Sequence, residues 1–185
     1  RQGAVLLASS QPLPVNLASG ASTSIAIQPL NSGAATKSGW ARLETDGGAL
    51  AGVATFQYVL GGALQTIAGV FAAPPMTSAT IPVDNDYDQE RLTGFAVANP
   101  NEEAILVDLI TLNEDGTLRD QVRPPSLNPL ASRCQAAAYL HEYLDSARKF
   151  RGSLRLVADG GKTMVVVALQ QARGLYTAIP VVPAR

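Results

Sequence analysis

The chain has 185 residues, of which 15 are acidic and 14 are Lys or Arg, so its formal net charge is −1. Apolar residues make up 46 % and charged residues 16 %, which excludes a chain that is disordered throughout. The near-neutral charge argues against a nucleic-acid binder, whose affinity depends on neutralising phosphates. No apolar run approaches the roughly 18 residues that a membrane-spanning helix needs. The composition predicts a globular protein of one domain or two small halves, and by itself it assigns no function.

The single cysteine, Cys134, excludes an intrachain disulfide and a cysteine zinc cluster. Only three of the 14 basic side chains are lysines, in a chain rich in Ala, Gly, Ser, Thr and Val. This composition is typical of secreted bacterial proteins, so we expect an extracellular location at the bacterial cell surface. Residues 1–3 do not resemble the start of a signal peptide. Either such a signal has been removed or the chain is part of a longer one.

The sequence repeats itself. Residues 39–48 (GWARLETDGG) recur as 152–161 (GSLRLVADGG), an offset of 152 − 39 = 113. The register continues without a gap and pairs Val53 with Val166. Such self-similarity over much of the chain indicates two copies of one structural unit.

A β-hairpin is the strongest element that each copy predicts. In chain order, the expected strand pairs are 39–45 with 50–57 and 152–157 with 163–170. Apolar and polar residues alternate in the first strand of each pair, as in half-buried strands, whereas residues 164–169 are apolar on both faces and predict a covered central strand. An Asp-Gly dipeptide joins each pair, and Gly accepts the positive φ of a tight hairpin turn without strain.

Further elements lie between these hairpins. Gly61-Gly62 predicts another hairpin turn, and Ile-Pro-Val at 81–83 predicts an edge strand or a strand start because proline cannot donate to a ladder. A strand over 104–112 is followed by an Asp-Gly turn and a short strand near 118–122. The one expected helix is short and lies near 139–147. The pattern predicts an all-β fold of two related Ig-like antiparallel β-sandwich units with one short helix.

The first predicted unit, 1–79, is incomplete relative to the second, 80–185. The offset places Arg1 opposite Glu114, so the opening strands of the second unit have no counterpart in the first. A sandwich without those strands exposes core surface and unpaired edges, which favours association. Three explanations are open. The chain is a piece of a longer one, the strands come from another copy by strand donation as in bacterial surface filaments, or the first half is smaller.

A resemblance accompanies this pattern. It is carried by GWAR, DGG and AGVATFQ within 39–57, by TGFAVANP at 93–100, by FRGSLRL at 150–156 and by GLYTAIPV at 174–181. Together these segments resemble the tandem β-sandwich modules of large secreted or surface proteins of environmental bacteria. The resemblance covers nearly the whole chain. It implies a β-sandwich fold and an extracellular setting, and it transfers no catalytic residue.

Carboxylates alternate at Asp84, Asp86 and Asp88, like the start of a calcium loop whose oxygens surround a hard cation. The segment lacks the Gly at the sixth position and the bidentate Glu at the twelfth position of such a loop. A solvated acidic linker between the two units is therefore the favoured interpretation, and a calcium site on these three residues is the alternative. No other cofactor is expected.

Catalysis is not predicted. His141 is the only histidine, and Cys134 precedes it by seven residues near a strand-to-helix transition. A nucleophilic system needs such groups in contact, which this spacing does not ensure. We therefore expect a protein that is not an enzyme.

Four residues are candidate contacts with a ligand or partner: Trp40, Arg42, Tyr58 and Arg155. The two arginines are equivalent in the repeat, and edge protection or cross-strand pairing is their favoured role. The equivalent of Trp40 is Ser153, so this tryptophan is not part of the shared scaffold. A tryptophan beside an arginine suits a sugar-binding platform or the centre of an interface.

These features predict a non-enzymatic extracellular structural protein, such as a surface filament subunit completed by strand donation or edge pairing with a neighbouring chain. The alternative is an extracellular binding module for carbohydrate or adhesion. We expect partners that are copies of the chain or neighbouring domains of the same protein. A glycan is the expected ligand in the alternative, and neither nucleic acid nor a membrane span is expected.

Overall fold

The structure, a computed structural model, describes residues 13–25 and 39–184, except for the side chain of Tyr58. The chain divides into two compact units, Arg1–Ser38 and Gly39–Arg185. The boundary predicted between the two repeats, after residue 79, comes from the repetition in the sequence and not from the contacts that define these compact units. It stays a prediction.

The described part of the first compact unit, residues 13–25, contains no helix or strand. The Ala21 N–H donates to the Ala18 carbonyl at 3.0 Å and closes one turn. Every described helix and strand belongs to the second compact unit.

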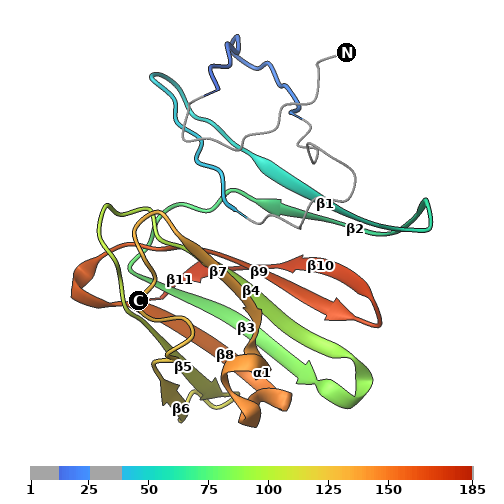
Figure 1. The fold of residues 1–185 in the computed structure, drawn as a ribbon, viewed down its shortest axis with the longest axis vertical. Coiled ribbons are helices and arrows are strands. Elements are labelled where there is room, and N and C mark those ends of the chain that lie inside the picture. Colours follow the sequence, from blue (N-terminus) through green and yellow to red (C-terminus); the bar gives the residue numbers. More distant parts are fainter. Residues whose placement is uncertain (1–12, 26–38, 185) are drawn as a thin grey trace. The chain divides into compact units, whose positions relative to one another are not determined.

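The second compact unit is built from antiparallel strands, which confirms the predicted all-β class (Figure 1). Its elements are β1 (Val53–Leu60), β2 (Ala63–Phe71), β3 (Ser78–Asp86), η1 (Tyr87–Gln89), β4 (Arg91–Ala98), β5 (Val107–Asn113), β6 (Leu118–Val122), β7 (Gln135–Tyr139), α1 (Leu140–Tyr143), η2 (Asp145–Arg148), β8 (Lys149–Ala158), η3 (Asp159–Gly161), β9 (Val165–Ala172), β10 (Leu175–Ile179) and β11 (Val182–Pro183). None of the described helices has the length and apolar character needed to cross a bilayer.

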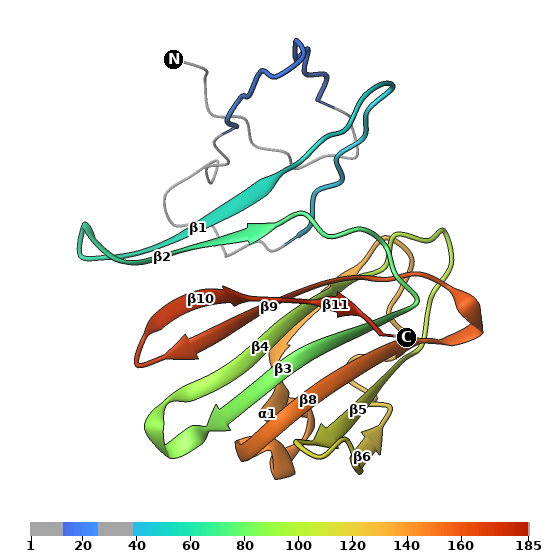
Figure 2. The ribbon, with the colours of Figure 1, turned by 180° about the vertical axis from the view of Figure 1, so that it is seen from behind.

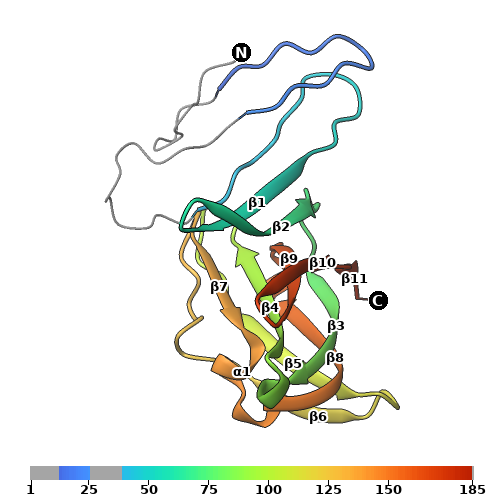
Figure 3. The ribbon, with the colours of Figure 1, turned by 90° about the vertical axis from the view of Figure 1, so that its right-hand side faces the viewer.

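The strands β3 to β11 pair in two groups. One has the order β6-β5-β8-β3, with β11 beside the start of β3, and the other has the order β7-β4-β9-β10. A single residue pair, Asp86 with Arg91, joins the groups at the turn between β3 and β4. The first group runs side by side in Figure 2, and in Figure 3 β7 and β4 lie on the side opposite β3 and β8.

One hydrophobic core is shared by the two groups. Leu154 and Leu156 of β8 are fully buried in it together with Val97 of β4 and Val166 of β9. The buried positions alternate along the second half of β8 and the first half of β9, as the period of two requires, whereas β4 also buries neighbouring residues. Each fully buried side chain of this size contributes about 1.5–3 kcal/mol, so the core is the main source of stability in this part of the chain.

The strands β1 and β2 form a separate two-stranded hairpin. The turn lies at Gly61-Gly62, as predicted, and both glycines have positive φ (58° and 79°). The ladder runs from the pair Leu60–Ala63 to the pair Val53–Phe71, with one irregularity after Tyr58.

The predicted hairpin over 39–57 is wrong in its pairing. Residues 39–52 form no strand and bend at 46–48, and β1 pairs with β2 instead. The equivalent segment of the second half is β8, which pairs along both edges, with β3 and with β5. Residues 39–45 have no such neighbours among the described strands, and an isolated strand is not stable in water.

The second predicted hairpin has the right strands and the wrong pairing. The strand β8 pairs with β3 and β5, whereas β9 pairs with β4 and β10. Asp159 explains the difference. Its carboxylate accepts from the Leu106 N–H, and its own N–H donates to the Leu106 carbonyl, both at 3.0 Å. The turn is therefore bound to the segment before β5 and crosses between the two strand groups.

The remaining elements agree with the sequence. The helix expected near 139–147 is present as two short pieces, α1 and η2, separated at Leu144. The Gly116 N–H donates to the Asn113 carbonyl at 2.9 Å in the predicted turn between β5 and β6. One edge of β3 pairs with β8 along its whole length. The other edge pairs only near its ends, with β11 and with β4, so Pro82 has a strand partner on one side only.

Gly152 is required where β8 crosses close to the end of β5. It has φ of 154°, and a Cβ atom there would lie 2.2 Å from the Leu112 carbonyl oxygen. We expect Gly152→Ala to lower the free energy of unfolding by about 3 kcal/mol. Gly39→Ala, whose Cβ meets no atom within 4 Å, should change it by less than about 0.5 kcal/mol. Urea unfolding followed by circular dichroism measures both, and equal losses would contradict this account.

Candidate functional site

Trp40 and Arg42 lie beside the loop that precedes β7. The half-buried Trp40 indole N–H donates to the Arg133 carbonyl at 2.9 Å, and Arg42 pairs with Glu44. The Arg133 guanidinium hydrogen-bonds Glu102 and holds the pKa of that carboxyl below its usual 4.5, with a smaller contribution from Arg42. Arg133 is 93 residues from Trp40 in the chain, so no local sequence signal indicated this contact.

The other two predicted contact residues lie elsewhere. Tyr58 pairs through its backbone in the β1–β2 hairpin, and its side chain lies outside the described structure. Arg155 is half-buried in the middle of β8, opposite Thr80 of β3 and Ile110 of β5. The expectation that Arg42 and Arg155 occupy equivalent hairpin positions is wrong, because Arg42 is not in a strand.

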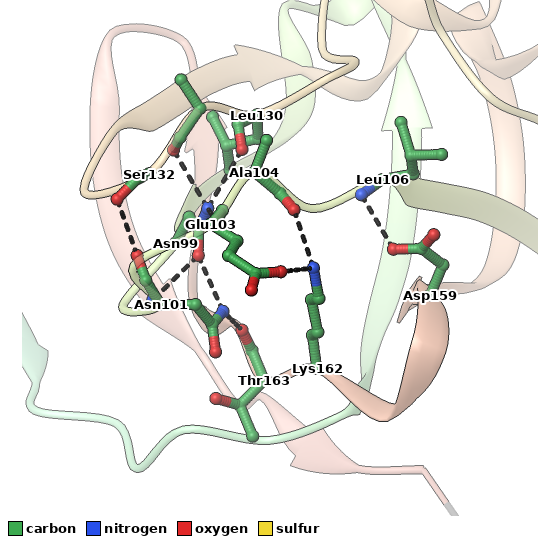
Figure 4. A network of polar contacts seen from close by, with 11 residues as sticks. Asn99, Asn101, Glu103, Ala104, Leu106, Leu130, Ser132, Asp159, Lys162 and Thr163 are labelled. Atoms are coloured by element: carbon green, nitrogen blue, oxygen red, sulfur yellow. Dashed lines mark hydrogen bonds and ion pairs between the residues drawn. The ribbon is translucent and has the colours of Figure 1, made fainter.

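A buried asparagine organises the loops next to Arg133 (Figure 4). Asn99 is 0 % exposed. Its Nδ2 donates to the carbonyls of Glu103, Leu130 and Ala131 at 2.7, 3.0 and 3.0 Å. Its Oδ1 accepts from the backbone N–H and the Nδ2 of Asn101, at 2.9 and 2.7 Å. One side chain therefore fixes two loops, one of which carries Glu102 and the other Arg133.

A lysine ties the same loop to the β8–β9 connection. Lys162 Nζ donates to the Glu103 carboxylate at 2.7 Å and to the Ala104 carbonyl at 3.2 Å, and Asn101 Nδ2 donates to the Thr163 carbonyl at 2.7 Å. The bond from Lys162 lowers the pKa of Glu103 from its usual 4.5. These contacts are between loops of one chain, so they position the surface and do not by themselves bind a ligand.

The acidic stretch is not a solvated linker, which corrects the favoured interpretation. Asp84 and Asp86 belong to β3 and Asp88 to η1. The register places Asp84 opposite Arg151 and Asp86 opposite Lys149 on β8, and Asp88 forms an ion pair with Lys149 at 2.5 Å that raises the lysine pKa. In the described ranges, no three acidic, histidine or cysteine side chains gather as metal ligands. A calcium site on these residues stays a prediction.

His141 lies between two tyrosines. Its ring centroid is 5.1 Å from that of Tyr87 and 5.8 Å from that of Tyr139, and its buried Nδ1 has no hydrogen-bond partner in the described structure. Burial and the Tyr176 hydroxyl raise the pKa of Tyr139 well above its usual 10, so this phenol stays protonated. Cys134 is an exposed free thiol. Nothing in these contacts activates a nucleophile, and the absence of catalysis stays a prediction.

Among the described strands, the β1–β2 hairpin carries the most exposed large apolar side chains, and these are here called the hairpin surface. Its large apolar side chains are between 51 % and 75 % exposed: Val53, Phe56, Val59, Leu60, Leu64, Ile67 and Phe71. No charged residue occurs in 53–71, although charges are the usual protection of a free strand edge. One face of the hairpin is already in use, because β2 contacts β10, the Tyr176 N–H donates to the Thr66 Oγ1 at 3.3 Å, and Ala68 and Val70 are buried. Two strands are only marginally stable without further packing, so the apolar side chains that remain exposed are the strongest candidate for an interaction.

No protein-family model matches the chain, and neither a curated protein nor a solved structure matches it significantly. The resemblance to tandem surface modules stays a prediction, and function is argued from the geometry.

Replacement of Asn99 tests the support of the Arg133 loop. Asn99→Ala leaves buried carbonyls and the Asn101 donors without partners, and each such loss costs about 1–3 kcal/mol. We expect the free energy of unfolding to fall by about 3 kcal/mol. Asn113→Ala, which removes an exposed bond to Thr117, should cost less than about 1 kcal/mol. Similar losses in the two variants, measured by urea unfolding, would show that the network has no special role.

The Lys162–Glu103 contact predicts a pH effect. Because the folded-state pKa of Glu103 lies below its unfolded value of 4.5, the contact stabilises the fold above that pH and is lost as the pH falls through the folded pKa. Lys162→Gln should return the Glu103 pKa toward 4.5, as followed by carboxyl ¹³C NMR. The pKa of Asp115, lowered by Thr117, should not move. An unchanged Glu103 pKa in the variant would refute the assignment.

Proposed function

We propose that the chain is a non-enzymatic extracellular structural protein that assembles with neighbouring copies of itself, as the subunit of a surface filament. The hairpin surface carries this proposal. Val53 is 57 % exposed, whereas Val166, its equivalent at the offset of 113 residues, is 0 % exposed. The same residue type at the same place in the repeat is solvent-exposed in one half and in the core of the other.

The positions of the strands support the repeat. Adding 113 to the bounds of β1 gives 166–173, and β9 spans Val165–Ala172. The same shift takes β2 to 176–184, which covers most of β10 and all of β11. The hairpin β1–β2 therefore corresponds to the hairpin that β9 forms with β10. In the second half, β9 also pairs with β4, and no described strand takes that place beside β1.

The strand pairs also support an Ig-like interpretation of the second unit. In an Ig fold, strands B and E pair in one sheet, and strands C and F pair in the other. The pairs β4–β7 and β5–β8 follow this order, and β6 lies beside β5 in the place of strand C′. Here β3 takes the edge beside β8 and β9 takes the edge beside β4, which exchanges the usual sheets of the first and last strands.

The second half indicates what would cover the hairpin surface. A strand of the β4 type, such as Thr-Gly-Phe-Ala-Val-Ala at 93–98, pairs with β9, while the core side chains of β3, β5 and β8 cover the inner face of β9. We infer that another copy of the chain supplies this cover to the first unit. An uncharged surface of this kind can be buried without the cost of desolvating charges.

A second candidate function is glycan binding. Tyr87 is 44 % exposed, and the Arg148 guanidinium lies 4.5 Å from its ring centroid. Tyrosine next to arginine is a frequent composition of binding surfaces. Tyr87 is a second aromatic candidate beside Trp40, whose N–H donates to the Arg133 carbonyl.

Self-association of the full chain tests the proposal. We expect oligomers at micromolar concentration in analytical ultracentrifugation. Val53→Asp with Phe71→Asp should weaken the association at least about tenfold, because burying each apolar side chain contributes about 1.5–3 kcal/mol. Electron microscopy of concentrated material should show filaments that the variant does not form.

The matched control is Leu118→Asp with Val182→Asp. These residues are similarly exposed, at 59 % and 51 %, and lie on β6 and β11, outside the hairpin surface. The control should associate like the unmodified chain. A chain that is monomeric at all concentrations, or a control that dissociates as readily as the hairpin variant, would overturn the proposal. Binding of neutral glycans by a monomer would favour the second candidate.

A further inference from the structure

An open depression of about 270 Å³ lies at the end of the first strand group, at the positions where the acidic stretch meets β8. Four cationic side chains from three strands line it, with one carboxylate: Arg91, Arg119, Lys149, Arg151 and Asp86. Arg91 comes from β4, Arg119 from β6, and the other two cations from β8. The topology therefore gathers positive charge that is dispersed over 60 residues of sequence.

Each cation is held in place by a neighbour. Arg91 pairs with Asp84 at 3.2 Å, and Lys149 pairs with Asp88 at 2.5 Å. Arg119 lies over the Phe150 ring at 4.8 Å and donates to the Ser146 carbonyl at 3.0 Å. Arg151 lies more loosely, 3.6 Å from Asp84 and 3.9 Å from Glu114. Preorganised donors of this kind lose less freedom when a ligand binds.

The counter-ions leave the lining positive. Asp84, Asp88 and Glu114 do not line this depression, whereas Asp86 does, so the formal charge of the lining is 4 − 1 = +3. The ion pairs that hold the cations are exposed, and such pairs stabilise little in water. Arginine carries five N–H donors and lysine carries three, so a cation that keeps its carboxylate partner can also donate to an incoming anion in short charge-assisted bonds.

We propose that this depression binds an oxyanionic group, namely the sulfate, carboxylate or phosphate of a ligand. The acidic stretch supplies the internal counter-ions that hold Arg91, Lys149 and Arg151 in place when the site is empty. Two sources offer this chemistry, a free inorganic anion and an acidic polysaccharide of the kind found around bacterial cells. The site shares no residue with the hairpin surface, so the proposal of an oxyanion site does not depend on self-assembly.

Titration of the full chain tests the site and separates the sources. Dextran sulfate, sodium sulfate and neutral dextran serve as probes, followed by calorimetry at constant ionic strength. Arg91→Gln with Lys149→Gln should weaken the binding of a sulfated probe at least about tenfold, since bonds to charged groups are the strong ones. Binding of dextran sulfate alone identifies a polysaccharide, and equal binding of sodium sulfate per group identifies a free anion.

The charge-matched control is Arg123→Gln with Arg173→Gln, which removes the same two charges outside the depression. It should bind like the unmodified chain. Asp86→Asn removes the one lining carboxylate and should tighten binding severalfold, a gain that misfolding cannot produce. An equal loss in the control, no gain with Asp86→Asn, or no binding of any sulfated probe would overturn the proposal.

Discussion

A central β-strand requires a neighbour on each edge and a core against one face, and this requirement decides which parts of the chain are folded into sheets. The strand β8 meets it. It pairs with β3 and β5, and Leu156 is fully buried. Residues 39–45 repeat the sequence pattern of β8, yet they form no strand. Leu43, the equivalent of Leu156, is 55 % exposed. The same local pattern gives a strand only where its pairing partners exist, because strand propensity is mostly a measure of packing.

How much of the fold can be predicted from the sequence depends on whether a feature is set by local or by distant contacts. Alternation predicted the strand over 152–157, the Gly61-Gly62 pair predicted one turn, and an Asp-Gly dipeptide predicted the turn after β5, because these features depend on neighbouring residues. Pairing depends on distant ones. The dipeptide Asp159-Gly160 has the composition of a hairpin turn, but the bonds from Asp159 to Leu106 direct the chain across to the other strand group. No local signal distinguishes this turn from a hairpin.

The candidate sites show the same limit. The carboxylates of Asp84 and Asp86 are evident in the sequence, but the residues that face them are not. The acidic segment therefore resembled either a linker or a calcium loop. The register of β3 with β8 places Arg151 and Lys149 opposite them. Opposite charges on facing strand positions stabilise each other, so the acidic run is half of a cross-strand charge pattern. The role of Asn99 could not be predicted from the sequence either, because its partners Leu130 and Ala131 are about thirty residues away and no motif indicates a buried asparagine network.

The distribution of charge connects the two proposed surfaces. None of the 15 acidic and 14 basic residues lies within 53–71, whereas four cations and their carboxylates surround the depression at the end of β8. An uncharged hairpin can be buried between chains without desolvating ions. Burial of an ion pair carries a desolvation penalty, so the ion pairs around the depression are better left in water. A single chain can therefore use the hairpin surface for assembly and leave the cationic depression open to solvent. In a filament of the proposed kind, each added subunit would repeat the depression, and weak oxyanion sites would act together on one long polyanion.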